Sequence, residues 1–381
     1  MKVIQFTTDN REQQNDYNNP LPHFGTAPEA LLEGFTALPD VEVYVISCVR
    51  REVGIPDRIH GNIRYHPVLV PKTGWMSTLY SGCIRATSRL VREIAPDIVH
   101  GQGTERDCAM NATYSGYPNV LTIHGNMAEL NRLGDTFQGA PMYGFLASRL
   151  ETHALRRTGG VFCNSAYTES LVAPRARQTW RVPNAIRADF FQPATGGSKR
   201  PIPTLVNVGV IGARKRQLEL LRMVGEIVKS GRQMQVVFAG SLSENSEYGA
   251  TFAAELRKAE AAGYAAFGGF LNLPELIRLL DSAHAFLHFP SEEAFGLVVA
   301  EAMARGLKFF GANLGGIVDI ASGIDGAELH NDFESLRTGI TRWLDAGAPA
   351  PELAADEIAK RYHPKVIAER HVEIYREVLG R

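Results

Sequence analysis

Residues 289–319 read FPSEEAFGLVVAEAMARGLKFFGANLGGIVD, and this stretch carries the clearest alternation of strand and helix patterns in the chain. The apolar segment 285–289 predicts a strand, and the good helix formers between Phe295 and Gly306 predict a helix. A second apolar strand at Phe309-Phe310 leads to a Gly-Gly turn, so the order is that of a βαβ unit in a parallel sheet. Ligands of such sheets bind at the carboxyl edge, where the free N–H groups and the dipole of the helix favour an anion such as phosphate.

Two carboxylates bracket the start of this helix. Glu293 lies in the preceding loop and Glu301 lies about one turn inside the helix, with seven residues between them. Both can therefore face one site, while the amides of Gly296, Leu297 and Val298 remain available for a phosphate. Taken singly, each Glu has a simpler interpretation. Glu293 would do no more than offset the helix dipole, and Glu301 would be a charged residue on a solvated helix face.

The combination resembles the E-x7-E signature of the retaining glycosyltransferases of family 4, which have the GT-B fold, and the match extends over the whole stretch. The resemblance implies that Glu293 contacts the donor sugar and that Glu301 holds the ribose hydroxyls of the nucleotide. It also implies that the backbone at Leu297 and Val298 meets the diphosphate. The other donor-binding residues that we expect in this turn are Phe295 and Gly296.

Length and composition fit a globular protein with two cores. The chain has 381 residues, of which 45% are hydrophobic and 21% are charged. The formal net charge of −1 gives no case for a nucleic-acid partner. Four widely separated cysteines without a C-x-x-C pair predict reduced core thiols rather than a disulfide framework or a zinc site.

The sequence also predicts the cellular location of the protein. The N-terminus enters a strand without a signal-peptide pattern, and no apolar run approaches the roughly 20 residues that span a bilayer, so we expect a cytoplasmic protein. Trp75-Met76 and Leu79-Tyr80 precede a helix on which Arg85, Arg89 and Arg92 share one face. Exposed aromatics beside basic residues would allow peripheral contact with the inner face of a membrane, and a solvated helix face is the alternative.

The first half alternates short apolar strands with helices, which predicts a parallel sheet covered on both faces. The predicted strands are 2–7, 41–47, 63–70, 97–101, 119–124, 160–164 and 179–182, and the predicted helices are 27–37, 81–94, 106–114, 141–157 and 166–172. The polar, Gly- and Pro-rich segment 192–201 predicts a linker. The second half repeats the pattern, with strands at 204–209, 235–240, 265–270, 284–289, 308–312 and 326–330 and helices at 217–229, 248–261, 273–282 and 297–305.

We therefore predict an α/β fold of the GT-B type, with two doubly wound Rossmann-like domains facing each other across a cleft. Residues 1–195 form the N-terminal domain on the acceptor side, and residues 196–362 form the C-terminal domain on the nucleotide-sugar donor side. The sequence also predicts a helix at 351–362, and apolar residues at helical spacing predict a final amphipathic helix at 364–379, within the terminal segment 363–381. The resemblance implies that this helix crosses back to the N-terminal domain.

A basic loop follows the first strand of the second domain. The strand ends at Gly209, which is a donor-binding candidate. The cations that follow can meet a diphosphate leaving group and stabilise its developing charge. Members of the resembled family commonly have Gly-Arg followed five residues later by Lys. Lys215 matches that Lys, but Val210 occupies the Arg position, so Arg214 or Arg216 would have to supply the second charge.

In the first domain, His124 lies at the carboxyl end of a predicted strand. A single His is more often structural, but the resemblance implies that this one lies near the donor sugar, and we count it with Glu293 and Lys215 as catalytic. His100 ends the preceding strand and is expected to act only through a neighbour. Gly25, in the loop before the first helix, is a donor-binding candidate, with an ordinary loop capped by Thr26 as the alternative.

Three further observations narrow the chemistry. Phe270 follows the third strand of the second domain, where the resemblance implies that the base of the donor binds. No Asp-x-Asp or His/Asp cluster has the spacing of metal ligands, so we predict no metal site and no required cofactor. No G-x-G-x-x-G follows the first strand, which argues against a nicotinamide site.

The predicted function is that of a retaining, metal-independent glycosyltransferase in glycan, polysaccharide or glycoconjugate biosynthesis. The donor would be a nucleotide-diphosphate sugar, with a UDP-sugar favoured over a GDP-sugar, and the acceptor a glycan, a lipid-linked glycan or a small molecule. No residue is an obvious nucleophile, so the resemblance implies a front-face route. The alternatives are a non-catalytic nucleotide-sugar-binding protein, which Val210 favours, and a nucleotide-sugar epimerase.

Overall fold

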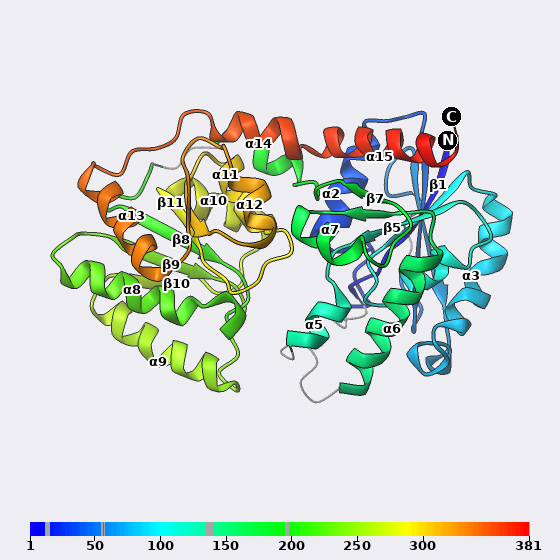
Figure 1. The fold of residues 1–381 in the computed structure, drawn as a ribbon, viewed down its shortest axis with the longest axis horizontal. Coiled ribbons are helices and arrows are strands. Elements are labelled where there is room, and N and C mark those ends of the chain that lie inside the picture. The colour runs from blue at the N-terminus through cyan, green and yellow to red at the C-terminus, as the bar shows by residue number, and fades with distance from the viewer. Residues whose placement is uncertain (12–15, 55, 57, 134–140, 195–197, 381) are drawn as a thin grey trace. The chain divides into compact units, whose positions relative to one another are not determined.

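The computed structural model describes residues 1–11, 16–54, 56, 58–133, 141–194 and 198–380. The chain divides into two compact units, Met1–Ala188 with Tyr362–Arg381, and Asp189–Arg361. The boundary predicted between residues 195 and 196 lies outside the described residues. Both chain ends belong to the first unit (Figure 1).

The first unit contains a seven-stranded parallel sheet. From edge to edge its strands are β3 (Ile63–Leu69), β2 (Glu42–Val49), β1 (Lys2–Phe6), β4 (Ile98–Gln102), β5 (Asn119–Ile123), β6 (Val161–Cys163) and β7 (Thr179–Arg181). The strand order reverses between β1 and β4, and such a point is where ligands of doubly wound sheets bind. The helices are α2 (Thr26–Thr36), α3 (Ser81–Ile94), α4 (Cys108–Thr113), α5 (Met127–Leu133), α6 (Pro141–Arg157), α7 (Ala166–Val172) and α15 (Pro364–Val378).

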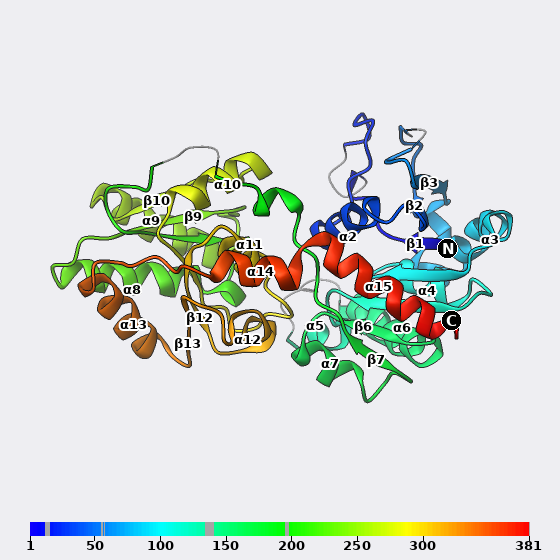
Figure 2. The ribbon, with the colours of Figure 1, turned by 90° about the horizontal axis from the view of Figure 1, so that it is seen from above.

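Both faces of this sheet are apolar and covered by helices. Val3 points into a core that contains residues of α2 and α15, whereas its neighbour Ile4 points into a core that contains residues of α3, α4 and α6. Figure 2 shows α15 lying against α2. The two helices approach closely because Gly34 has no side chain, and a Cβ there would lie 2.1 Å from the backbone oxygen of Pro364.

The second unit contains a six-stranded parallel sheet with the same order relative to its own first strand. Its strands are β10 (Ala265–Phe267), β9 (Gln235–Ala239), β8 (Thr204–Val208), β11 (Ala285–His288), β12 (Lys308–Ala312) and β13 (Ala327–His330). Here the order reverses between β8 and β11. The helices are α8 (Gln217–Lys229), α9 (Glu247–Ala261), α10 (Leu273–Ser282), α11 (Leu297–Ala304), α12 (Gly315–Ala321), α13 (Phe333–Asp345) and α14 (Ala354–Tyr362).

The prediction of two doubly wound α/β sheets is confirmed. Three helices, α5, α12 and α13, were not predicted, and β10 ends three residues before Phe270. The expected Gly-Gly turn is wrong, since Gly315 and Gly316 form the first turn of α12. The expected exposed aromatics are also wrong, because Trp75 and Tyr80 are both 3% exposed and belong to the core beside α3.

Candidate active site

In the second unit, the predicted residues gather at the carboxyl ends of the two central strands. The basic loop that follows β8 includes a 3-10 turn, Ala213–Lys215, and leads into α8. The loop after β11 carries Glu292 and Glu293 and leads into α11. Both loops start where the strand order reverses, and Ser291 joins them because its N–H donates to the backbone oxygen of Arg214 at 2.8 Å.

Glu293 lies between two basic side chains. Its Oε2 accepts a hydrogen bond from His288 Nε2 at 2.9 Å and is ion-paired with Lys215 Nζ. Burial opposes the ionisation of this carboxyl group. The hydrogen bond from His288 and the charge of Lys215 outweigh that effect, so the pKa of Glu293 is lowered to about 2. Glu293 is therefore a carboxylate near neutral pH.

His288 is a candidate site residue that was not predicted from the sequence. It is 1% exposed at the last position of β11, and burial lowers the pKa of its imidazole. The neutral ring donates to Glu293 through Nε2, and its buried Nδ1 has no hydrogen-bond partner among the described residues. A His at a strand end five residues before Glu293 was the available signal, but in the sequence it looked like part of an apolar strand.

The glycine pair at the start of α12 fixes the backbone of Glu293. Gly316 N–H donates to the backbone oxygen of Glu293 at 3.0 Å. A Cβ on Gly315 would lie 2.1 Å from that same oxygen, and a Cβ on Gly316 would lie 2.3 Å from the oxygen of Ala294. Gly315 also has a φ of +52°, which favours glycine. Only two residues without side chains allow α12 to approach the Glu293 loop this closely.

The start of α11 has the geometry expected of an anion site. Gly296 is the N-cap with a φ of +97°, so Leu297 and Val298 belong to the first turn, whose N–H groups have no acceptor within the helix. Glu301 lies on the second turn and is 5% exposed, and Phe295 is 3% exposed. The structure thus places Glu301 on the same short helix as the two amides.

The other cations of the basic loop are engaged elsewhere. Arg214 Nη1 is 2.9 Å from Glu292 Oε2, and it also donates to the backbone oxygen of Glu292 at 3.1 Å. The Arg216 guanidinium lies 4.4 Å from the ring centroid of Phe333. Val210, at the position where the resembled family has Arg, is 66% exposed. Of these three cations, Lys215 is the one paired with Glu293.

Two donor-binding candidates lie in loops at the same sheet edge. Gly209 directly follows β8 with a φ of +151°, and its N–H donates to the backbone oxygen of Ala239 at 2.9 Å. Phe270 lies in the loop after β10 and is 81% exposed. Gly240 N–H donates to the oxygen of Gly269 at 2.7 Å, which ties the Phe270 loop to the end of β9.

In the first unit, the carboxyl ends of β4 and β5 form a second polar group. His124 is half-buried and donates through Nε2 to Gln102 Oε1 at 3.0 Å. Burial lowers the pKa of His124 to about 4, although a hydrogen bond with Asn184 acts in the opposite direction. The imidazole is therefore neutral near pH 7.

Glu105 is the second candidate site residue that was not predicted from the sequence. It lies three residues after β4, and its Oε1 accepts a hydrogen bond from the N–H of Gly125, next to His124. Burial raises the pKa of Glu105 to about 7, and the charge of Glu151 acts in the same direction, while hydrogen bonds from backbone amides oppose it. Glu105 sits in a loop without a recognisable motif, so the sequence carried no signal for it.

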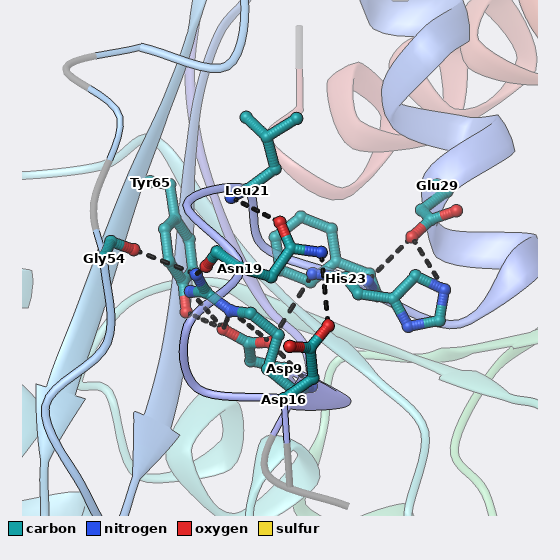
Figure 3. Close-up of polar contacts among 10 residues, drawn as sticks. Asp9, Asp16, Asn19, Leu21, His23, Glu29, Gly54 and Tyr65 are labelled. Carbon is teal, nitrogen blue, oxygen red and sulfur yellow. Dashed lines mark hydrogen bonds and ion pairs between the residues drawn. The ribbon is translucent and has the colours of Figure 1, made fainter. Parts of the chain in front are cut away.

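The loop between β1 and α2 is held by a buried ion pair (Figure 3). Arg11 Nη2 lies 2.7 Å from Asp9 Oδ2, both side chains are fully buried, and Tyr65 donates its hydroxyl to the same carboxylate at 2.7 Å. Gly25 ends this loop as the N-cap of α2, so the alternative in which Thr26 caps the helix is wrong. Glu29 closes the turn by accepting the N–H of Phe24 at 2.8 Å.

The remaining candidates of the first unit are His100, which has a structural role, and the three arginines of α3. His100 is fully buried and is hydrogen-bonded through Nδ1 to the Tyr375 hydroxyl at 2.5 Å and through Nε2 to Thr122 at 2.7 Å, which joins β4 to α15. On α3, Arg85, Arg89 and Arg92 are exposed. Among the described residues, no helix combines the length and the apolar character that crossing a membrane requires.

Comparison with known proteins agrees with this architecture. The family model described as Glycosyltransferase Family 4 matches residues 29–190, and the model described as Glycosyl transferases group 1 matches residues 191–356. Over 118 residues the chain is 34% identical to the sulfoquinovosyl transferase SQD2 of Arabidopsis thaliana. That match covers 31% of this chain and spans 21% of the relative's length.

Solved structures share the fold over the whole chain. Sucrose-phosphate synthase from Thermosynechococcus elongatus aligns with a TM-score of 0.76 at 16% identity, covering 100% of this chain and 99% of that one. HepE from Anabaena in complex with UDP and glucose aligns with a TM-score of 0.69 at 14% identity, covering 99% of this chain and 100% of that one. Both family models and these shared two-sheet folds lead to one conclusion: the chain belongs to glycosyltransferase family 4 and has the GT-B fold.

Proposed function

We propose that this glycosyltransferase retains the anomeric configuration as it moves a sugar from a nucleotide-diphosphate sugar, preferably a UDP-sugar, to an acceptor hydroxyl. The observation that carries the proposal is the cluster of Lys215, Glu293 and His288 beside the first turn of α11. A cation, an ionised carboxylate and free helix amides are together suited to a diphosphate joined to a polyhydroxyl group. HepE has been solved in complex with UDP-glucose, which supports the choice of donor.

In this proposal the second unit binds the donor. Glu301 accepts hydrogen bonds from the ribose hydroxyls, and the amides of Leu297 and Val298 donate to the diphosphate. Lys215 faces Glu293 in the structure, so a donor placed here would set its phosphate against the ammonium and its sugar hydroxyls against the carboxylate. Because Glu293 is ionised, it can accept hydrogen bonds from those hydroxyls.

The proposed transfer needs neither a metal nor a cofactor. The bond between the anomeric carbon and the diphosphate oxygen breaks, and its electron pair leaves with the diphosphate. The acceptor oxygen bonds to the same face of the anomeric carbon, and its proton passes to the departing phosphate. Lys215 stabilises the negative charge that develops on the leaving group, so catalysis rests on charge placement and positioning.

The first unit is proposed to bind the acceptor, a hydroxyl-bearing glycan, lipid-linked glycan or small molecule. Glu105 supports this role, because its half-buried carboxyl group has a pKa of about 7. Near neutral pH it can donate a hydrogen bond to a sugar hydroxyl when protonated and accept one from it when ionised. His124 lies beside it as a neutral imidazole, and the family resemblance assigns it a position near the donor sugar.

A second candidate function is donor binding without turnover, and one observation favours it. Val210 is exposed and uncharged where relatives carry Arg, and both Arg214 and Arg216 have other partners. The site then has one cation, Lys215, facing Glu293. A single cation suffices for binding, and the two functions differ in whether the donor is consumed.

The test is a thermal-shift panel with UDP, GDP, ADP and their glucose conjugates on the wild type, Glu301→Gln and the matched control Glu244→Gln, which is on an exposed loop. We expect one nucleotide to raise the melting temperature of the wild type and of Glu244→Gln, and to raise it much less in Glu301→Gln. The ligand-induced shift is compared within each variant, so a change in basal stability does not enter. No shift with any nucleotide would contradict the proposed donor site.

A further inference from the structure

Three metal-ligand side chains meet in the core of the first unit, apart from the candidate active site. They are Cys48 on β2, Cys83 on α3 and Asp107, the residue before α4. Their exposed fractions are 7%, 0% and 4%, and their ligand atoms all lie within 4.8 Å of one another. The three come from three different elements, so the fold and not the local sequence brings them together.

The spacing of these atoms suits a metal ion. When three atoms are separated by no more than 4.8 Å, a point exists that is no more than about 2.8 Å from each of them. Zinc binds thiolate sulfur at about 2.3 Å and carboxylate oxygen at about 2.0–2.2 Å. Shifts of roughly half an ångström in side chains would therefore complete the coordination without moving the backbone.

Asn111 provides a fourth group on the next turn of α4. Its Nδ2 donates to Asp107 Oδ2 at 2.8 Å and to Cys48 Sγ at 3.5 Å, so its amide end faces the cluster. Asn111 is 2% exposed, and its Oδ1 has no hydrogen-bond partner among the described residues. A half-turn of the amide would exchange its two ends and direct Oδ1 at the centre of the cluster.

The charge and the polarisability of these four ligands indicate which metal ion would bind. Two thiolates and one carboxylate carry three negative charges, so a divalent cation leaves a single negative charge in the core. Arg106 adds a positive charge that acts on Asp107. Thiolates favour zinc over magnesium or calcium, and four protein ligands without an open position are typical of structural rather than catalytic zinc sites.

We propose that Cys48, Cys83, Asp107 and Asn111 form a structural site for a thiophilic divalent cation, with zinc as the expected ion. The ion would join β2, α3 and α4 of the first unit. The proposal is independent of the proposed function, because none of the four residues is among those assigned to the donor or the acceptor. It also revises the expectation from cysteine spacing, since ligands 35 and 24 residues apart leave no short motif.

Metal content and cobalt spectra test the proposal on the full chain. Wild-type protein is stripped with a chelator and titrated with Zn²⁺ and, separately, with Co²⁺ under reducing conditions. We expect about one equivalent of bound metal and, with cobalt, a near-ultraviolet charge-transfer band that reports thiolate ligands. Cys83→Ser should lose about half of the band's intensity, because Cys48 alone remains as a thiolate ligand, and Asn111→Ala should bind about 10- to 100-fold more weakly. Cys163→Ser, a buried cysteine on β6, should bind like the wild type.

Three outcomes would overturn the proposal. One is a folded wild type that binds neither ion, which would leave the four residues as a hydrogen-bonded cluster. Another is a cobalt band of undiminished intensity in Cys83→Ser. The third is a Cys48–Cys83 disulfide in the protein as isolated, seen as a loss of about two mass units, together with no metal uptake after reduction. The wild-type titration decides the matter even if a cysteine variant fails to fold.

Discussion

Two carboxylates occupy comparable places in the two units and have opposite properties. Glu105 follows β4 in the first unit and Glu293 follows β11 in the second, and each of these strands is the one at which its sheet reverses order. Glu293 faces Lys215 and His288, and its pKa is lowered to about 2. Glu105 has an amide N–H from Gly125 and the charge of another carboxylate nearby, and its pKa is raised to about 7.

The difference supports the proposed binding of the donor by the second unit and of the acceptor by the first. Burial acts in the same direction on both carboxyl groups, so the neighbouring charges decide which one ionises. A site that must bind an anionic diphosphate and direct sugar hydroxyls needs fixed charges. A site that binds a neutral hydroxyl is served by a group that can both donate and accept a hydrogen bond. The proposed division into a donor unit and an acceptor unit follows from this contrast.

The largest expected effect comes from removing the cation of the second unit. Lys215→Ala should lower the rate of donor consumption by about 10²- to 10³-fold, because the leaving group loses its stabilising charge. The measurement is the release of nucleotide from the donor identified by thermal shift. Arg214→Ala, whose guanidinium pairs with Glu292, is the neighbouring control and should lose much less. Equal losses in both variants would contradict the special role of Lys215.

The stability change at acidic pH concerns Glu293. Its pKa is lower in the folded state than its ordinary value of 4.5, so its contribution to stability is complete above about pH 4.5 and is lost as the pH falls towards 2. The shift corresponds to about 3 kcal/mol. Glu293→Gln should remove this dependence, as measured by hydrogen exchange of peptides covering β11 and α11. If wild type and variant lose protection from hydrogen exchange in parallel on acidification, the ion pair of Glu293 does not cause the pH dependence of stability.

The stability change between mildly acidic and neutral pH concerns Glu105. Its pKa is higher in the folded state than its ordinary value, so stability falls as the pH rises from about 4.5 to 7, where the buried carboxyl group must ionise. Because Glu105 is partly exposed, we expect about 2 kcal/mol rather than the full value. Glu105→Gln should therefore gain stability relative to wild type between pH 5 and pH 8 in thermal denaturation. Glu93→Gln on exposed α3 should show no such gain.

The smallest effect is expected from an ion pair outside both sites. Arg232 and Asp345 are joined at 2.9 Å on the surface of the second unit, where water screens their charges. Arg232→Ala should leave both donor consumption and the melting temperature essentially unchanged. A loss comparable with that of Lys215→Ala would mean that ion pairs in general, and not the Glu293 cluster, account for the effects above.

Much of the fold could be predicted from sequence because apolar strands alternate with amphipathic helices along nearly the whole chain. The strand Ala285–His288 and the helix Leu297–Ala304 were predicted within one residue at each end. Helix α13 was missed although Asp332 caps it by accepting the N–H of Ser335, since a cap is informative only once a helix is suspected. Helix α12 was missed because Gly315-Gly316 resembles a turn.

Only those site residues that belong to a sequence motif could be predicted. The spacing of Glu293 and Glu301 and the basic loop around Lys215 drew attention to the second unit, and the structure brings Lys215 to Glu293. His288 and Glu105 carry no motif, because their importance depends on which charges lie around them. Lys215 reaches Glu293, and the Gly125 amide reaches Glu105, because the strands that precede them are neighbours in their sheets, and the sequence does not display strand order.

Retention by this chain is tested by following UDP-, GDP- and ADP-glucose by NMR with the wild-type protein and with Lys215→Ala, using water and an excess of simple glycosides as acceptors. We expect wild type to consume one of the three donors, to release its nucleoside diphosphate and to form product with the α configuration of the donor, and we expect Lys215→Ala scarcely to do so. A donor that binds but is never consumed would make this a binding protein, and a β product would contradict retention.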